Sequence, residues 1–199
     1  MNYEIVLASN NAHKLKEVRE ILCPHGIIVY GLNDVNLHPG EVIENAPDYY
    51  GNALIKAKSV QELTSFPIIA DDSGLEIEAL DNGPGIKSAR FAKEHGGHAQ
   101  AIEYILKNIK DNRKARFICD ICLLNVDNKP LRFEGIVEGE IAYEPYGEGG
   151  FGYDPIFICK ESGKTYAEMD QKDKNKLSHR GKALKKLLTY LLINGKIKH

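Results

Sequence analysis

Residues 67–75 read PIIADDSGL, a short apolar run followed by two aspartates, a serine and a glycine. An apolar run bounded in this way is typical of a buried strand. Residues 75–79 then alternate apolar and acidic side chains, as a half-exposed strand does. The sequence therefore predicts that Asp71 and Asp72 lie in a turn at the end of a buried strand.

Hydrophobic spacing on both sides of this stretch predicts further strands and helices. Strands are expected over 3–7, 115–124 and 131–141, the last two as a hairpin that turns at 127–130. Helices are expected after the first strand, from a cap at Asn45 to about Leu63, over 99–109, and from Ser178 to near Gly195. Glycine-rich loops are expected over 83–85 and 147–150, the second leading into an apolar strand within 151–157.

Composition limits the class of protein. At 199 residues, with 43% hydrophobic and 27% charged, the chain is long enough for one domain, or one body with two lobes. It has no apolar run near the ~20 residues of a membrane span and no basic N-terminal start of a signal peptide. We expect a cytoplasmic protein without a membrane partner. The net charge of −2 argues against nucleic acid as a partner.

Charge is unevenly distributed along the chain. Residues 34–81 hold ten acidic and two basic side chains, whereas residues 160–199 hold eleven Lys or Arg and four acidic side chains. Solvated helix faces explain most such charges. The functional interpretation is a cleft with an acidic, metal-binding wall and a basic, anion-binding wall.

The chain has four cysteines, of which Cys119 and Cys122 form a CxxC pattern. This pattern lies inside a predicted strand, where residues three apart face opposite sides. We therefore expect reduced, mostly buried thiols rather than a zinc or redox site.

Three segments carry groups suited to phosphate and base chemistry. The turn of residues 9–14 offers backbone N–H groups, a hydroxyl, an amide and a lysine to a phosphate, although it also fits an ordinary capped helix start. Asp71 and Asp72, with Glu44, suit Mg²⁺, which takes one or two carboxylates plus substrate phosphates; an Asx-turn is the alternative. Residues 149–154 form either a glycine-rich turn with a core aromatic or a loop in which Phe151 stacks on a base.

The last predicted helix opens with Ser178-His179-Arg180. The helix dipole is positive at this end, so two cationic groups there conflict with it and suggest a binding site. Their convergent donors suit an oxo group such as the O6 atom of a purine. An arginine paired with a surface carboxylate is the simpler alternative.

Five segments in chain order resemble the inosine triphosphatase family, the pyrophosphatases of non-standard purine nucleoside triphosphates. They are LASNNAHK (7–14), ADDSGL (70–75), PGIKSAR (84–90), GGFGYDPIF (149–157) and SHRG (178–181). The resemblance covers nearly the whole chain.

This resemblance implies an α/β fold with a long, curved mixed sheet flanked by helices, and two lobes with a central cleft within one domain of residues 1–199. It implies Mg²⁺-dependent hydrolysis of ITP, dITP and XTP to the monophosphate and pyrophosphate. The implied partners are the purine nucleoside triphosphate and a second copy of the chain in a homodimer.

The resemblance also implies roles for individual residues. Asp72 is the expected general base, supported by Asp71, and Glu44 and Asp72 are the expected metal ligands. The expected substrate contacts are Ser9, Asn10, Asn11, Ala12, His13, Lys14, Ser73, Phe151, Gly152, Tyr153, Asp154, Lys174, His179 and Arg180.

One departure from the family pattern has a structural consequence. Ser9-Asn10 stands where many relatives have Thr-Gly, so a left-handed backbone is expected at Asn10.

Two other classes of protein remain as alternatives. A non-catalytic nucleotide-binding protein can dispense with Asp72, and a Maf-like pyrophosphatase is expected to lack the Ser178-His179-Arg180 segment at this position.

Overall fold

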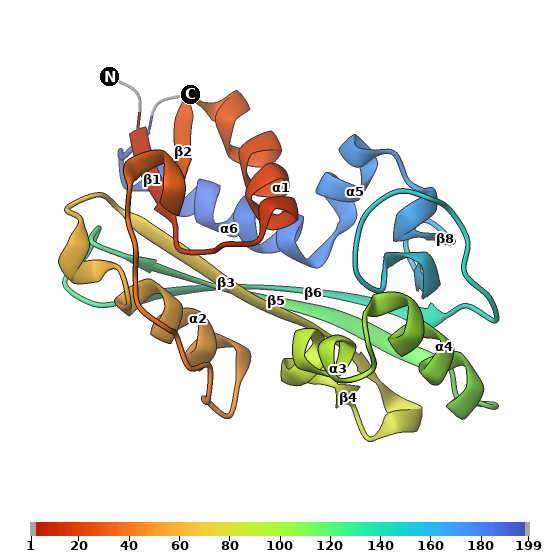
Figure 1. The fold of residues 1–199 in the computed structure, drawn as a ribbon. Coiled ribbons are helices and arrows are strands. Elements are labelled where there is room, and N and C mark those ends of the chain that lie inside the picture. Colours follow the sequence, from red (N-terminus) through yellow and green to blue (C-terminus); the bar gives the residue numbers. More distant parts are fainter. Residues whose placement is uncertain (1–2, 198–199) are drawn as a thin grey trace. The chain divides into compact units, whose positions relative to one another are not determined.

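The structure, a computed structural model, describes residues 3–197 (Figure 1). Its strands form a mixed sheet in the order β2-β1-β3-β5-β6-β7-β8, with β4 paired to β3. The strands are β1 (Tyr3–Leu7), β2 (Ile27–Gly31), β3 (Ile68–Ile77), β4 (Gly83–Pro84), β5 (Lys114–Leu124), β6 (Leu131–Ile141), β7 (Phe157–Cys159) and β8 (Lys164–Thr165). β1 is parallel to β2 and β3, whereas the β3/β4, β6/β7 and β7/β8 pairs are antiparallel.

Helices flank this sheet, so the expected α/β class, a mixed sheet flanked by helices, is confirmed. They are α1 (Ala12–Leu22), α2 (Tyr49–Lys58), α3 (Ser88–Glu94), α4 (His98–Asn108), α5 (Gln171–Leu177) and α6 (His179–Ile193). Short 3₁₀ turns cover Cys23–His25, Leu32–Val35, Gln61–Leu63, Glu78–Leu80, Gly85–Lys87, Asp154–Ile156 and Tyr166–Glu168.

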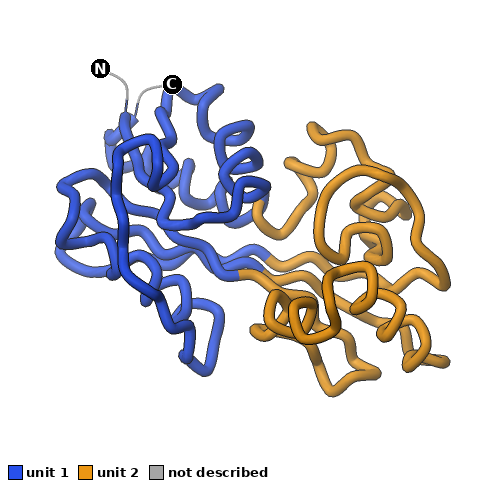
Figure 2. The backbone as a smooth tube through the Cα atoms, viewed as in Figure 1, with its two compact units in different colours: residues 1–72, 119–135, 181–199 blue, residues 73–118, 136–180 orange. Residues whose placement is uncertain are grey.

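The chain divides into two compact units (Figure 2). Unit 1 comprises residues 1–72, 119–135 and 181–199, and unit 2 comprises residues 73–118 and 136–180. The three longest strands, β3, β5 and β6, contribute residues to both units.

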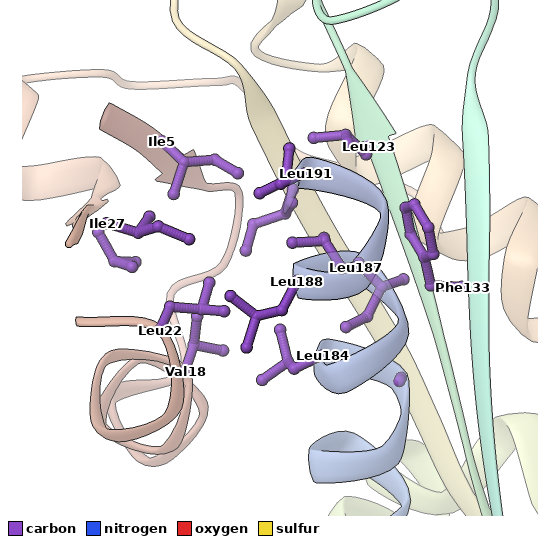
Figure 3. Close-up of a cluster of buried hydrophobic side chains, with 14 of the residues drawn as sticks. Ile5, Val18, Leu22, Ile27, Leu123, Phe133, Leu184, Leu187, Leu188 and Leu191 are labelled. Atoms are coloured by element: carbon purple, nitrogen blue, oxygen red, sulfur yellow. The ribbon is translucent and has the colours of Figure 1, made fainter. Parts of the chain in front are cut away.

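Unit 1 has a hydrophobic core on each face of its strands. On one face, α6 places Leu184, Leu187, Leu188 and Leu191 at helical spacing against side chains from α1, β1, β2, β5 and β6 (Figure 3). Each buried leucine contributes about 2 kcal/mol through burial of apolar surface. On the other face, α2 packs Ala53 and Ala57 against the strands. The sheet of unit 1 is therefore covered on both sides.

Unit 2 has its own core. It contains side chains from the C-terminal halves of β3 and β6 and from the N-terminal half of β5. Side chains of α3, α4 and the segment around Tyr166 pack against them. Three aromatic rings, Phe117, Phe157 and Tyr166, meet at its centre, with ring centroids 4.7 to 5.6 Å apart.

The predicted turn at Asp71 and Asp72 is wrong, because β3 continues through both residues to Ile77. The predicted cap at Asn45 is also wrong, because Asp48 caps α2 and the helix runs only from Tyr49 to Lys58. Asp48 accepts a hydrogen bond from the Gly51 amide at 2.6 Å. The capping residue therefore lies three positions later than expected.

Other expectations concern loops and short elements. The hairpin of β5 and β6, neighbours in the sheet, is confirmed, as are β1, α4 and α6. The strand expected within 151–157 is β7, which begins only at Phe157. Among the non-glycine residues of 3–197, left-handed backbone occurs at Asn36, Asp81, Asn82 and Asn125, so its prediction at Asn10 is wrong. Spacing did not predict β2, β4, β8, α3 or α5, and the loop expected over 83–85 contains the short strand β4.

The cysteines follow the strand geometry. Cys119 packs in the core beside α6 and Cys122 in the core beside α2, so the two thiols face opposite sides of β5. No disulfide joins the four cysteines, and Cys119, Cys122 and Cys159 are buried, as expected, whereas Cys23 is exposed. Within residues 3–197, no helix is long and apolar enough to cross a membrane.

Gly74 allows close packing in unit 2. A Cβ at this position would collide with the carbonyl group of Gly85, a backbone group that cannot rotate away. Gly74→Ala should therefore destabilise the protein by about 2–3 kcal/mol. Gly40→Ala is the matched control, because nothing lies within 4 Å of its Cβ position. Urea unfolding measures both, and equal midpoints for the two variants would contradict the packing constraint.

Candidate active site

Helix α2 brings two polar side chains to Asp72. Asn52 and Lys56 lie four residues apart and so share one helix face. The Asn52 amide nitrogen donates to Oδ2 of Asp72 at 3.2 Å, and the Lys56 ammonium donates to Oδ1 at 3.2 Å. Both carboxylate oxygens of Asp72 therefore have a partner on α2, which fixes the orientation of this buried group.

The same two side chains hold the segment that precedes α2. The Lys56 ammonium also pairs with Glu44 at 2.8 Å, and the Asn52 side-chain oxygen accepts from the Ala46 amide at 3.0 Å. The Asp72 and Glu44 carboxylates therefore converge on one cation. Lys56 and Asp72 are largely buried, with 14% and 10% of their side chains exposed, so their ion pair is little screened by solvent, whereas Glu44 is 37% exposed.

These contacts shift two pKa values. Burial raises the pKa of Asp72 above its usual value, and Glu44 adds to the shift, although Lys56, Lys14 and Asn52 oppose it. Burial alone would lower the pKa of Lys56, but the carboxylates of Asp72, Asp71 and Glu44 outweigh it and raise this pKa. Asp72 is therefore a stronger base than an exposed aspartate, and Lys56 stays charged at neutral pH.

Asp71 lies on the opposite side of β3 from Asp72, because successive side chains of a strand alternate. Its carboxylate pairs with the Lys14 ammonium at 3.1 Å and is 2% exposed. It also lies 3.9 Å from the Cys119 thiol. The structure therefore does not bring the two aspartates together on one face, and it joins Asp71 to the predicted phosphate-binding lysine instead.

The turn before α1 is an exposed helix cap. Asn11 caps α1 by accepting from the Lys14 amide at 3.1 Å, and Ser9 accepts from the Asn11 amide at 3.1 Å. The remaining predicted contacts in this turn, Asn10, Ala12 and His13, are exposed. A phosphate-binding turn and an ordinary capped helix start both fit this geometry, because either one directs N–H groups to solvent.

The donor set fits Mg²⁺. This ion takes one or two carboxylates and completes its shell with water and substrate phosphates. Glu44 and Asp72 already share one cationic partner at 2.8 and 3.2 Å. Among residues 3–197, no group of three acidic, His or Cys side chains gathers as a closed metal site. An open site of two carboxylates is the arrangement that leaves room for phosphates.

Unit 2 holds a separate cluster around Phe151. Arg180, at the start of α6, is 2% exposed and donates to the Ser73 hydroxyl at 3.1 Å. The centre of its guanidinium lies 5.8 Å from the Phe151 ring, and the Lys174 ammonium lies 4.8 Å from the same ring. Two cations therefore adjoin the aromatic ring that the sequence predicts to stack on a base.

Asp154 orders the glycine-rich loop. Its Oδ2 atom accepts from the Phe151 amide at 2.7 Å and pairs with Lys174 at 2.6 Å. Lys174 and Asp154 are 3% and 5% exposed, so this is a buried ion pair. A Cβ at Gly150 would collide with the same carboxylate. Asp154 thus fixes the loop from Gly150 to Phe151 in place.

Two further predicted contacts are built into the core of unit 2. The His179 ring stacks on Phe117 with centroids 4.5 Å apart and planes 7° apart, which fixes the plane of the imidazole. Tyr153 is 3% exposed and its hydroxyl donates to the Ser88 carbonyl at 2.8 Å. The Tyr153 side chain is therefore taken up by the core of unit 2, which leaves only its backbone to face a ligand.

Asn52 and Lys56 were missed by the sequence analysis. A signal was present, because Lys56 is one of only two basic residues among ten acidic ones in the segment 34–81. A polar pair four apart on a helix face that is otherwise lined by alanines was a second signal.

Comparison with known proteins agrees with this fold. A model of the Ham1 family matches residues 5–190, and the chain belongs to that family. A dITP/XTP pyrophosphatase of Bacillus subtilis is 43% identical over 188 residues, covering 92% of this chain and 94% of the relative. A dITP/XTP pyrophosphatase of Clostridium tetani is 40% identical over 188 residues, covering 92% and 93%. A solved HAM1 protein from Coxiella burnetii has a TM-score of 0.83 at 40% identity, covering 95% of this chain and 98% of that chain.

The raised pKa of Asp72 predicts a stability effect. The native protein binds a proton there more tightly than the unfolded chain, so Asp72 stabilises the fold less as the pH rises above its usual pKa of 3.8. Without divalent metal, the free energy of unfolding of Asp72→Asn should therefore increase relative to that of the wild type as the pH rises from 4 to 7. Urea unfolding in EDTA measures this, with the exposed Asp111→Asn as control. A wild-type advantage that grows with pH would contradict the assigned burial effect.

Proposed function

We propose that the protein hydrolyses non-standard purine nucleoside triphosphates, dITP, XTP and ITP, to the monophosphate and pyrophosphate. The observation that carries this proposal is the Asp72 carboxylate, buried, raised in pKa and held at both oxygens by α2. The names of the relatives from Bacillus subtilis and Clostridium tetani support the same activity.

Unit 1 would carry out the phosphate chemistry. Lys14 and Lys56 bring positive charge beside the two aspartates and would neutralise charge on the triphosphate. Asp71 positions Lys14 through their ion pair. Amides of the turn before α1, those of Asn10 and Ala12, would contact the phosphates, as N–H groups at a helix start commonly do.

Asp72 would act as general base. It accepts a proton from a water that attacks the α-phosphorus in line. The bond from that phosphorus to the oxygen that bridges to the β-phosphorus breaks, and pyrophosphate leaves. Because its pKa is raised, the Asp72 carboxylate is better matched to this proton transfer than an exposed aspartate would be.

Glu44 and Asp72 are the residues that would hold Mg²⁺. When bound, the ion supplies neutralisation of phosphate charge and polarisation of the attacked group. Asn52 keeps the segment of Glu44 against α2 through the Ala46 amide, so both proposed ligands depend on the same helix.

Unit 2 would recognise the base. Phe151 offers a ring for stacking, with Gly152 and the Tyr153 backbone beside it, and Lys174 and Asp154 hold the loop. His179 and Arg180 would donate to O6 of hypoxanthine or xanthine, while Ser73 holds the Arg180 guanidinium. Adenine has an amino donor at this position, so ATP would leave these donors unpaired. The same readout does not separate hypoxanthine from guanine.

A panel of substrates tests the function. With Mg²⁺, pyrophosphate release from ITP, dITP and XTP should exceed release from ATP by about 10–100-fold for each unpaired donor. Pyrophosphate and phosphate are assayed separately, with GTP included. Arg180→Ala should narrow the difference between ITP and ATP.

Two outcomes of this panel would contradict the proposal. Release of phosphate in place of pyrophosphate would place cleavage at the terminal phosphoryl group. Equal rates with ITP and ATP would remove the O6 readout.

A further inference from the structure

A second buried carboxylate faces α2, and the proposed chemistry does not use it. Asp120 on β5 is 1% exposed and pairs with Arg132 on the neighbouring strand β6. The pair is bidentate, with Nε and an Nη atom of Arg132 donating to the two carboxylate oxygens at 2.7 and 2.8 Å. Such forked pairs hold the guanidinium plane in one orientation.

The oriented guanidinium of Arg132 reaches α2. Its central carbon lies 5.6 Å from the centre of the Tyr50 ring, which is in the first turn of the helix. Arg132 also pairs with Glu134 at 2.7 Å. Asp120 first, and then the charges of Glu134 and Asp48, raise the pKa of Arg132 above its ordinary value, although burial opposes them. Both the cap and the first turn of α2 therefore interact with this arginine.

Tyr50 has a second neighbour on the strands. Burial raises the pKa of the Tyr50 hydroxyl, and the Cys122 thiol on β5 adds to the shift. Asp120 and Cys122 lie two residues apart on β5 and so point to the same face. The Tyr50 ring thus contacts Arg132, on the face of the strands to which Asp120 and Cys122 point.

Helix α2 depends on such anchors. It has only ten residues and contains a glycine, so it is too short to be stable by itself. Asn52 follows Tyr50 by two residues, and Lys56 follows by six. A shift of the first turn of α2 would therefore move both groups that hold Asp72.

We propose that Arg132 is a positioning residue for the hydrolysis, because its contact with Tyr50 places α2 so that Asn52 and Lys56 hold Asp72. This inference rests on the function proposed above. Arg132 itself contacts neither the nucleotide nor the attacking water. Its effect is on the chemical step, because the base-recognition cluster belongs to unit 2 and contains no residue of α2.

Arg132→Met tests this role, since methionine keeps an unbranched stem and loses the guanidinium. We expect kcat with dITP to fall about tenfold while KM changes less than twofold, as for a displaced catalytic group. Amide hydrogen exchange over residues 49–58 should become faster. Arg116→Met is the matched control, because Arg116 is similarly exposed, at 43% against 49%, and pairs with Glu76 between strands of unit 2. It should leave kcat and the exchange of residues 49–58 unchanged.

Two further variants separate positioning from simple destabilisation. Arg132→Met leaves the Asp120 charge buried without its partner, and Asp120→Asn in the same chain removes that charge. Tyr50→Leu removes the ring, and combined with Arg132→Met it should lower kcat no further than either change alone. We expect the Asp120→Asn, Arg132→Met double variant to regain stability in urea but to keep the low kcat.

Three results would overturn the proposal. They are a wild-type kcat in Arg132→Met, recovery of kcat in the double variant with Asp120→Asn, and unchanged exchange over residues 49–58. Failure of the proposed function would look different, since the wild-type protein would then release no pyrophosphate from dITP. In that case the exchange of residues 49–58 still decides whether Arg132 positions α2.

Discussion

Asn52 and Lys56 of α2 bind the buried carboxylate of Asp72, and the rest of unit 1 depends on this interaction. Two adjacent aspartates in the middle of a buried strand would be costly without partners, because burying an unpaired charge costs several kcal/mol. The fold solves this separately on each face of β3. Lys14 from α1 meets Asp71, and Lys56 with Asn52 from α2 meets Asp72.

This arrangement joins stability to function. Lys14 and Lys56 neutralise the two buried aspartates of β3 and are also suited to bind phosphates. Burial makes Asp72 more basic because it raises the pKa of this side chain. The site therefore keeps a carboxylate that a purely structural strand would replace with an apolar residue. Unit 2 follows a similar rule, because the buried Lys174 and Asp154 pair orders the loop that presents Phe151.

The sequence predicted the elements with strong periodicity and missed those determined by tertiary contacts. The strand of residues 3–7, the hairpin and the leucine face of α6 follow from local spacing alone. The acidic turn was a wrong prediction, because aspartates favour turns unless distant lysines pair with them. The start of α2 was misplaced because Asn45 and Asp48 are both suitable capping residues. In the structure the Gly51 amide donates its hydrogen bond to Asp48. The family motifs identified most proposed contacts but not Asn52 and Lys56, whose importance appears only when α2 packs on β3.

The central claim is that Asp72 activates water while other groups bind the nucleotide. The most direct test is Asp72→Asn, which keeps the shape of the side chain and removes its basicity. Single-turnover hydrolysis of dITP should slow by about a thousandfold, while calorimetric binding of a non-hydrolysable dITP analogue stays measurable. A variant that hydrolyses dITP at the wild-type rate would contradict the assignment of Asp72 as the general base.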